Sequence, residues 1–269
     1  MTQKIKKWSI IFGFVFSFIA ILLSSEEIIA WQIDNYKTNK TIAKLQSITS
    51  INEIADSPTT NIIESVEEQP KTSYYWQYLN QKLIDVDFTE LQKINPDTIG
   101  WIQVNGTNIN YPFVQTKDNS YYLNHSFDQS NNNAGWVFLD YRNHLNNLDN
   151  NTILYAHGRL DTTMFGSLKN LLKSSWYDNP DNYLIKLSTP TSNSLWQVFS
   201  VYHLETTNDY IYTNFLTTSQ YQDFLNTITS RSIYNFNTTL NTNDKIITLS
   251  TCYNKDEKMV MHAKLIKYE

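Results

Sequence analysis

The feature that most constrains the fold of this chain is a succession of short runs rich in β-branched and aromatic residues between Gly100 and Ile266. The runs are separated by Asn, Asp, Gly and Pro, which favour turns, so each run predicts a β-strand. The predicted strands cover residues 100–104, 107–111, 135–139, 152–156, 183–187, 195–204, 245–251 and 259–266. This series predicts a mostly β domain, a closed or nearly closed mixed β-barrel of seven to eight strands with peripheral helices.

Two helical patterns interrupt the predicted strands. The first begins at Asp161 or Thr162, either of which can cap a helix, and it places apolar residues on one face as far as Leu172. The second opens with the capping-box pattern Ser219-x-x-Gln222 and keeps apolar residues at helical spacing to about residue 231. We expect both helices at the periphery of the barrel.

The N-terminal region carries an uncharged run of eighteen residues from Trp8 to Ser25. As a helix this run is about 27 Å long, which is enough to cross a thin hydrocarbon core, and it predicts an N-terminal transmembrane helix. Lysines precede the run and Glu26-Glu27 follows it, which orients the N-terminus toward the cytoplasm and the rest of the chain outside. The alternative is a cleaved signal peptide, but no A-x-A-like site follows and the run is longer than a usual signal-peptide core.

The chain is therefore predicted to have four parts. They are a cytoplasmic tail (1–7), a transmembrane signal anchor (8–25), an extracytoplasmic stalk with N-terminal helices (26–86) and a compact domain (87–269). Within the stalk, residues 28–48 are loosely helical in pattern, the polar and acidic stretch 52–72 indicates a spacer, and residues 73–84 predict a short helix.

The composition excludes several classes of function. The formal net charge is −5 and no basic cluster follows the first few residues, so nothing indicates a protein that binds nucleic acid. A single cysteine excludes an intrachain disulfide and a cysteine-based zinc site. No carboxylates are grouped as in a calcium site, and we expect neither a metal nor another cofactor.

The single cysteine, Cys252, ends the run Ile246–Cys252, which predicts a buried strand with one thiol at its tip. Such a thiol is either a small buried hydrophobe or a nucleophile that needs a histidine. His157 ends the predicted strand 152–156 and precedes Gly158, which is a suitable place for a proton-transfer group. The other histidines are explained as loop or ordinary strand residues: His125, His144, His203 and His262. Adjacent barrel strands can bring His157 and Cys252 to one substrate carbonyl, although their adjacency does not follow from the sequence.

Short motifs along the chain resemble the sortases, and within them class B. They occur in the order and spacing of the family over residues 87–269: Leu123-Asn124-His125, Phe138-Leu139-Asp140-Tyr141-Arg142-Asn143, Tyr155-Ala156-His157-Gly158, Met164-Phe165-Gly166, Thr248-Leu249-Ser250-Thr251-Cys252 and His262-Ala263-Lys264-Leu265. The helix predicted at about 219–231 is similar to the extra helix of class B. The resemblance implies a sortase-like barrel and identifies residues 87–269 as its catalytic domain.

The resemblance further implies a cysteine transpeptidase of Gram-positive bacteria that is anchored in the cell membrane and acts outside it. Such an enzyme cuts a C-terminal sorting motif, of the N-P-x-T kind in class B, after its Thr. By resemblance, Cys252 attacks the Thr carbonyl and forms a thioester, while His157 protonates the departing amine. His157 then takes a proton from the incoming amine of a cell-wall precursor or a pilin lysine. The residues implied in binding the sorting peptide are Asn119, Leu123, Tyr210, Ser250, Thr251 and Tyr253, with the loop and helix at about 208–235.

One position departs from the family pattern. Sortases carry an arginine four residues before the His262-Ala263-Lys264-Leu265 motif, where it steadies the substrate or the oxyanion, and here the residue is Lys258. An ammonium group supplies charge without the planar, bidentate fork of a guanidinium. Three alternatives follow: Lys258 acts as a point charge, Arg142 or Arg159 reaches the site, or the enzyme is slow or inactive. Lys258 is equally explained as a solvated lysine, and Arg142 is more simply explained as the partner of a neighbouring carboxylate.

Two rival functions use the same residues. A cysteine endopeptidase would pass the acyl group to water and release surface peptides, so it differs only in the fate of the acyl-enzyme. A degenerate sortase domain would bind sorting motifs without cutting them, an alternative that the lysine at position 258 leaves open.

Overall fold

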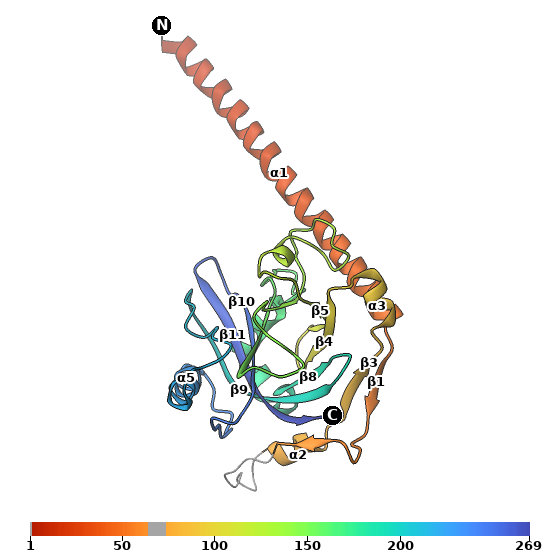
Figure 1. The fold of residues 1–269 in the computed structure, drawn as a ribbon. Coiled ribbons are helices and arrows are strands. Elements are labelled where there is room, and N and C mark those ends of the chain that lie inside the picture. The colour runs from red at the N-terminus through yellow and green to blue at the C-terminus, as the bar shows by residue number, and fades with distance from the viewer. Residues whose placement is uncertain (1, 64–73) are drawn as a thin grey trace.

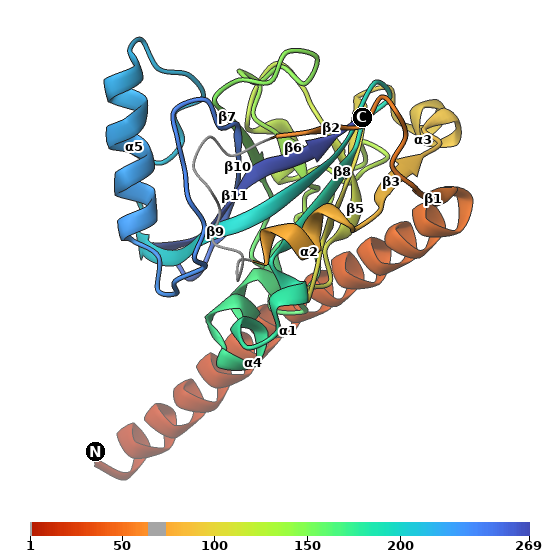
Figure 2. The ribbon, with the colours of Figure 1, turned by 90° about the horizontal axis from the view of Figure 1, so that it is seen from below.

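The computed structural model describes residues 2–63 and 74–269 and contains the predicted barrel (Figures 1 and 2). Eight strands form one sheet in the order β10-β7-β6-β5-β4-β8-β9-β11, and β11 pairs back onto β10 to close it. The strands are β4 (Thr98–Val104), β5 (Asn110–Val114), β6 (Phe138–Leu139), β7 (Asn151–Tyr155), β8 (Leu184–Ser188), β9 (Asn193–Glu205), β10 (Ile246–Cys252) and β11 (Glu257–Tyr268). The predicted fold class, a mostly β closed barrel with peripheral helices, is confirmed.

The barrel is mixed, because β5 pairs with β6 and β7 pairs with β10 in parallel, whereas its other pairs are antiparallel. The register of β7 and β10 aligns Tyr155 with Ser250, so His157 and Cys252 follow two residues later at the same edge. On the other side of β10, the register sets Cys252 opposite Lys258 of β11. One edge of the barrel therefore carries a thiol, an imidazole and an ammonium group.

The barrel interior is filled by an apolar core, and a second apolar cluster lies between the barrel and α5 (Thr218–Ser230), the helix predicted at about 219–231. The buried residues of this helix have the predicted spacing: Tyr221, Phe224, Leu225 and Ile228. Its cap differs from the prediction. The N-cap is Thr217, whose hydroxyl accepts a hydrogen bond from the backbone N–H of Gln220 at 3.2 Å, whereas Ser219 lies inside the helix.

The first predicted helix, from residue 161 or 162 to 172, is wrong in its first half. Thr162 and Met164 have φ angles of 64° and 51°, in the left-handed region that a right-handed helix excludes. Asp161 instead caps a turn, because its carboxylate accepts hydrogen bonds from the backbone and hydroxyl of Thr163 at 3.2 and 2.7 Å. A 3-10 helix, η2 (Gly166–Leu172), and the short α4 (Ser174–Tyr177) follow this turn. The other short helices after residue 87 are α3 (Thr89–Ile94), η1 (Tyr121–Leu123) and η3 (Pro180–Asn182).

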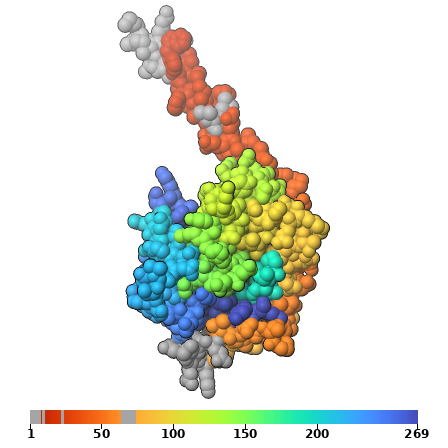
Figure 3. All heavy atoms as spheres, in the orientation of Figure 1, coloured from red at the N-terminus to blue at the C-terminus, as the bar shows by residue number. Residues whose placement is uncertain are grey.

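The N-terminal part of the chain is one long helix, α1 (Thr2–Ile48), which projects from the barrel with its N-terminal half and meets the barrel with its C-terminal half (Figures 1 and 3). By length and composition alone, this helix is apolar enough to cross a membrane, and it is the one such helix in the part of the chain that the structure describes. It continues unbroken from the predicted anchor, residues 8–25, into the predicted stalk.

The segment after α1 packs on the barrel, in contrast to the spacer predicted over 52–72. It contains β1 (Ile51–Ile54), β2 (Asn61–Ile62), α2 (Tyr75–Leu79) and β3 (Leu83–Val86). β1 pairs with β3, and β2 extends the sheet beyond β11. The helix predicted over 73–84 is thus confined to five residues, and the predicted spacer residues 64–72 lie outside the described part of the chain. The buried ammonium group of Lys267 ties the segment to β11, because it donates to the carboxylate of Asp56 at 2.6 Å.

Candidate active site

Cys252 and His157 line one small pocket of about 270 Å³ at the edge where β7 and β10 end. The remaining lining residues are Trp31, Asn133, Gly158, Arg159 and Leu160. Gly158 is required for this arrangement, because a Cβ atom at this position would collide with the carbonyl oxygen of Cys252. The thiol is partly exposed, so a ligand in the pocket meets both side chains.

The imidazole of His157 is held in one orientation by the loop before β6. Its Nε2 lies 2.6 Å from the carbonyl oxygen of Leu123, and since a carbonyl can only accept, Nε2 carries the hydrogen. Gly135, with a φ of 61°, passes so close that a Cβ atom there would lie 3.0 Å from Cδ2 of the ring. The backbone carbonyl of His157 accepts a hydrogen bond from Phe165 at 3.1 Å, which fixes the following loop.

Lys258 lies directly across the β10–β11 ladder from Cys252, and its Nζ is 3.2 Å from Sγ. The contact is partly buried, where charges interact more strongly than in bulk water. A positive charge at this distance stabilises negative charge that develops on the sulfur or on an oxygen bound beside it. The lysine is therefore not simply a solvated side chain at a strand end.

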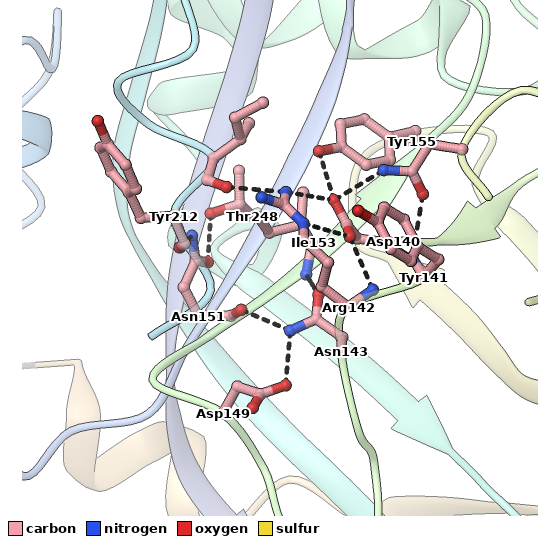
Figure 4. A network of polar contacts seen from close by, with 12 residues as sticks. Asp140, Tyr141, Arg142, Asn143, Asp149, Asn151, Ile153, Tyr155, Tyr212 and Thr248 are labelled. Atoms are coloured by element: carbon pink, nitrogen blue, oxygen red, sulfur yellow. Dashed lines mark hydrogen bonds and ion pairs between the residues drawn. The ribbon is translucent and has the colours of Figure 1, made fainter. Parts of the chain in front are cut away.

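Arg142, one of the two arginines considered as an alternative, is bound away from the pocket. Its guanidinium forms a bidentate ion pair with Asp140 at 2.8 and 2.6 Å and donates to the carbonyl of Ile211 at 3.0 Å (Figure 4). Burial raises the pKa of Asp140, but the hydrogen bonds from Arg142 outweigh burial, and the pKa lies below its usual value. Arg142 is thus the partner of a neighbouring carboxylate.

Arg159, the second arginine, lines the pocket, but its guanidinium is also engaged. It donates to the side-chain oxygen of Asn35 in α1 and lies 3.3 Å from the carboxylate of Asp161, and its side chain is only 8 % exposed. Lys258 is therefore the cation in contact with the sulfur of Cys252.

Three of the residues implied in peptide binding adjoin the pocket. The carbonyl of Leu123 holds His157, as described above. The hydroxyl of Thr251 donates to the carbonyl of Ala156 at 2.7 Å and so links the ends of β10 and β7. Tyr253 follows Cys252, and its ring stacks on His203 with the ring centroids 4.9 Å apart.

The other three residues implied in peptide binding use their polar groups within the fold. The hydroxyls of Ser250 and Tyr210 are 3.0 Å apart in a buried contact, and burial raises the pKa of Tyr210. The side-chain amide of Asn119 donates to the carboxylate of Asp140 at 2.9 Å. In this arrangement these side chains support the strands and loops around the site.

A buried chain of hydrogen bonds beneath the site was not predicted. Thr248 donates to Asn151 at 2.6 Å, so its hydroxyl oxygen accepts the hydrogen bond of 2.8 Å from Nδ1 of His262. Nε2 of His262 then accepts from the hydroxyl of Tyr202, also at 2.8 Å. Burial, and to a lesser degree the charge of Arg231, lower the pKa of His262 to about 3. The sequence predicted His262 to be an ordinary strand residue. The periodicity of apolar residues does not show which buried side chains form hydrogen bonds, so this chain of hydrogen bonds could not be predicted.

Comparison with known proteins agrees with this fold and site. The sequence model of the sortase domain family matches residues 102–266. Sortase B of Staphylococcus aureus (strain NCTC 8325 / PS 47) is 40 % identical over 192 residues, which cover 70 % of this chain and 78 % of the relative. Sortase B of Listeria monocytogenes (serovar 1/2a, strain ATCC BAA-679 / EGD-e) is 35 % identical over 184 residues, which cover 67 % and 74 %. The chain belongs to the sortase family, whose members are cysteine transpeptidases.

Solved structures narrow the assignment. A Staphylococcus aureus sortase B–substrate complex superposes with a TM-score of 0.63 at 40 % identity and covers 67 % of this chain and 84 % of that one. The sortase B from B. anthracis in complex with AAEK1 superposes with a TM-score of 0.69 at 34 % identity and covers 87 % and 99 %. The resemblance to class B is therefore confirmed, and the enzyme is a transpeptidase of the sortase B type.

Proposed function

We propose that the enzyme is anchored in the cell membrane by residues 8–25 and cuts an N-P-x-T-like sorting motif after its Thr outside the cell. It then joins the acyl group to an amine of a cell-wall precursor or a pilin. One observation carries the proposal: the pocket that holds His157 also holds Cys252, whose sulfur is 3.2 Å from the ammonium group of Lys258.

In the first half of the reaction, Cys252 gives its thiol proton to His157, and the resulting thiolate sulfur attacks the Thr carbonyl carbon of the sorting motif. The carbonyl oxygen becomes negatively charged, and Lys258 stabilises it as a point charge beside the sulfur. His157 gives a proton to the amine as the C–N bond breaks. The product of this half is a thioester on Cys252.

In the second half, an incoming amine attacks the thioester carbonyl and loses a proton to His157. The C–S bond breaks, and the sulfur of Cys252 leaves with the electron pair. The hydrogen bond from Nε2 to Leu123 leaves Nδ1 as the ring nitrogen that exchanges protons with the two amines. Relatives support a peptide donor and an amine acceptor: one sortase B structure contains a substrate and another contains triglycine.

Mass spectrometry separates the proposed transfer from its rivals. The full chain in detergent micelles is incubated with an N-P-x-T peptide, with and without triglycine, and the expected products are a thioester on Cys252 and a ligated peptide in excess of free acid. Free acid alone at saturating triglycine would identify an endopeptidase, and binding without a thioester would identify a degenerate domain. The control is Cys252→Ala, which should abolish cleavage and keep the melting temperature.

A further inference from the structure

The C-terminal half of α1, which was predicted to belong to the stalk, packs on the barrel beside the pocket. Asn35, Thr38 and Leu45 lie on one face of the helix and are at most 8 % exposed. Thr38 accepts a hydrogen bond from Asn132 at 3.1 Å, in the loop that leads to β6. Figures 1 and 2 show the helix lying along the barrel over this half. The orientation of α1 relative to the pocket is therefore fixed by contacts on the pocket's own loops.

One of these contacts reaches the loop of the proposed acid–base residue. The guanidinium of Arg159, two residues after His157, donates to Asn35 and pairs with Asp161. Asn133, which also lines the pocket, donates to the carboxylate of Asp34 at 3.2 Å. Two lining residues are thus bonded to adjacent positions of α1.

These contacts present Trp31 to the pocket. Trp31 lies one turn before Asn35 on the same face of α1 and lines the pocket together with Cys252 and His157. Its side chain remains 41 % exposed, so the indole is a wall of the pocket and not a member of the core. Leu160, which is 82 % exposed, adds apolar surface to the same lining.

The position of the pocket indicates which substrate it serves. Besides Cys252, it is lined by His157 and the three residues that follow, so it extends from the sulfur toward the imidazole side. In the proposed reaction the departing and incoming amines both exchange protons with His157, and the groups attached to them must lie on that side. An indole face attracts ammonium groups, packs against peptide planes and excludes water.

We infer that Trp31 of α1 forms the wall of the acceptor subsite, which binds a small peptide bearing a primary amine and keeps water from the thioester. This inference rests on the proposed function. In the step concerned, the amine nitrogen bonds to the thioester carbon, the C–S bond breaks, and the amine proton passes to His157. Trp31 is not required for the sulfur to attack the donor, and its contact with the acceptor supports the transfer step.

The test measures the two halves of the reaction separately in the full chain in detergent micelles. With an N-P-x-T peptide and triglycine, Trp31→Ala should lower the ratio of ligated product to free acid about tenfold and raise the KM for triglycine, since about 1.4 kcal/mol of binding corresponds to a factor of ten. The rate of thioester formation should stay within about twofold. Trp31→Phe should restore most of the ratio. The matched control is Tyr36→Ala, an aromatic of the same helix that is 68 % exposed and is not among the lining residues of the pocket.

Two results would overturn the inference. One is an unchanged product ratio in Trp31→Ala, and the other is an equal loss of thioester formation and transfer, which would indicate a role in folding or in donor binding. Failure of the wild-type chain to form a thioester is a different result, because it would remove the proposed function itself.

Discussion

A lysine in contact with the sulfur of Cys252 limits how charge is stabilised in the site. The ammonium group is a compact point charge, and at 3.2 Å from Sγ it can follow negative charge from the sulfur to an adjacent oxyanion. A guanidinium in its place has a planar fork and could contact both at once. Lys258 is therefore the residue whose substitution tests how negative charge is stabilised in this site.

Substitution of Lys258 tests this role. Lys258→Arg should keep or raise kcat/KM for cleavage of the sorting peptide, whereas Lys258→Ala should lower it about 10²-fold, the usual cost of removing one oxyanion partner. The measurement is the initial rate of peptide cleavage. Lys255→Ala provides the matched control, because Lys255 is an exposed lysine in the turn between β10 and β11.

If Lys258→Ala cleaved the peptide at the wild-type rate, another cation would have to stabilise the oxyanion. Arg159 would be the first to examine, because it lines the pocket. Arg142 would be excluded by its bidentate pair with Asp140 unless that pair breaks when substrate binds.

At the scale of elements, the strand that carries Cys252 is supported by a buried histidine. His262 of β11 connects Thr248 of β10 with Tyr202 of β9 and is neutral, because burial lowers its pKa to about 3. The unfolded chain binds a proton at this residue near pH 6.5, and the folded chain does not. The titration of His262 therefore leaves the free energy of unfolding unchanged above pH 6.5 and lowers it as the pH drops from 6.5 toward 3.

We expect this histidine to make the fold sensitive to acid. From pH 7.5 to pH 4.5 the free energy of unfolding should drop by about 3 kcal/mol through His262 alone, which corresponds to two pH units below its unfolded pKa. Urea unfolding of the wild type and of His262→Gln at both pH values isolates the contribution of His262 to this drop in the free energy of unfolding. The variant should be less stable at pH 7.5 but lose about 3 kcal/mol less than the wild type on acidification. Equal losses in both proteins would contradict the assignment.

The long elements of this fold could be predicted from the sequence, and the short strands that follow α1 could not. The barrel strands and α5 have clear apolar periodicity, because each buries one face or both. β1 and β2 are short and contain no buried residue, and they form because the edges of β3 and β11 are available to them. The helix expected from residue 162 failed because the capping residue Asp161 stabilises a turn with positive φ instead.

The candidate site could be predicted only in part, for a similar reason. Cys252 and His157 were recognisable because each ends a predicted strand, and the register of β7 and β10 supplied the adjacency that the sequence lacked. Trp31 carried no signal, because it lies 126 positions before His157 and reaches the pocket only through the tertiary contacts of α1. Asn119 and Tyr210 were implied in peptide binding by the resemblance, but their polar groups are bonded within the fold here.

At the scale of the whole molecule, the barrel and the segment before it form one unit. Lys267 of β11 is fully buried, and its ammonium group donates to Asp56 at 2.6 Å and to the carbonyls of Leu79 and Gln81 at 2.9 and 2.6 Å. These acceptors lie before residue 87, where the compact domain was predicted to begin. A domain cut at that point would keep a buried charge and lose every partner named here, which is costly.

Lys267→Met tests this coupling, because it keeps the length of the side chain and removes its charge. The two carbonyls would lose their donor, and we expect a destabilisation of about 2–4 kcal/mol, or a melting temperature lower by about 5–10 °C. Lys82→Met is the matched control: its ion pair with Glu53 spans 3.7 Å between side chains that are 57 % and 60 % exposed, so it should change stability by less than about 0.5 kcal/mol. A fragment of residues 87–269 should be at least as unstable as Lys267→Met, since it loses Asp56, β1 and β3 together. If the fragment melted at the wild-type temperature, the segment would be an independent stalk after all.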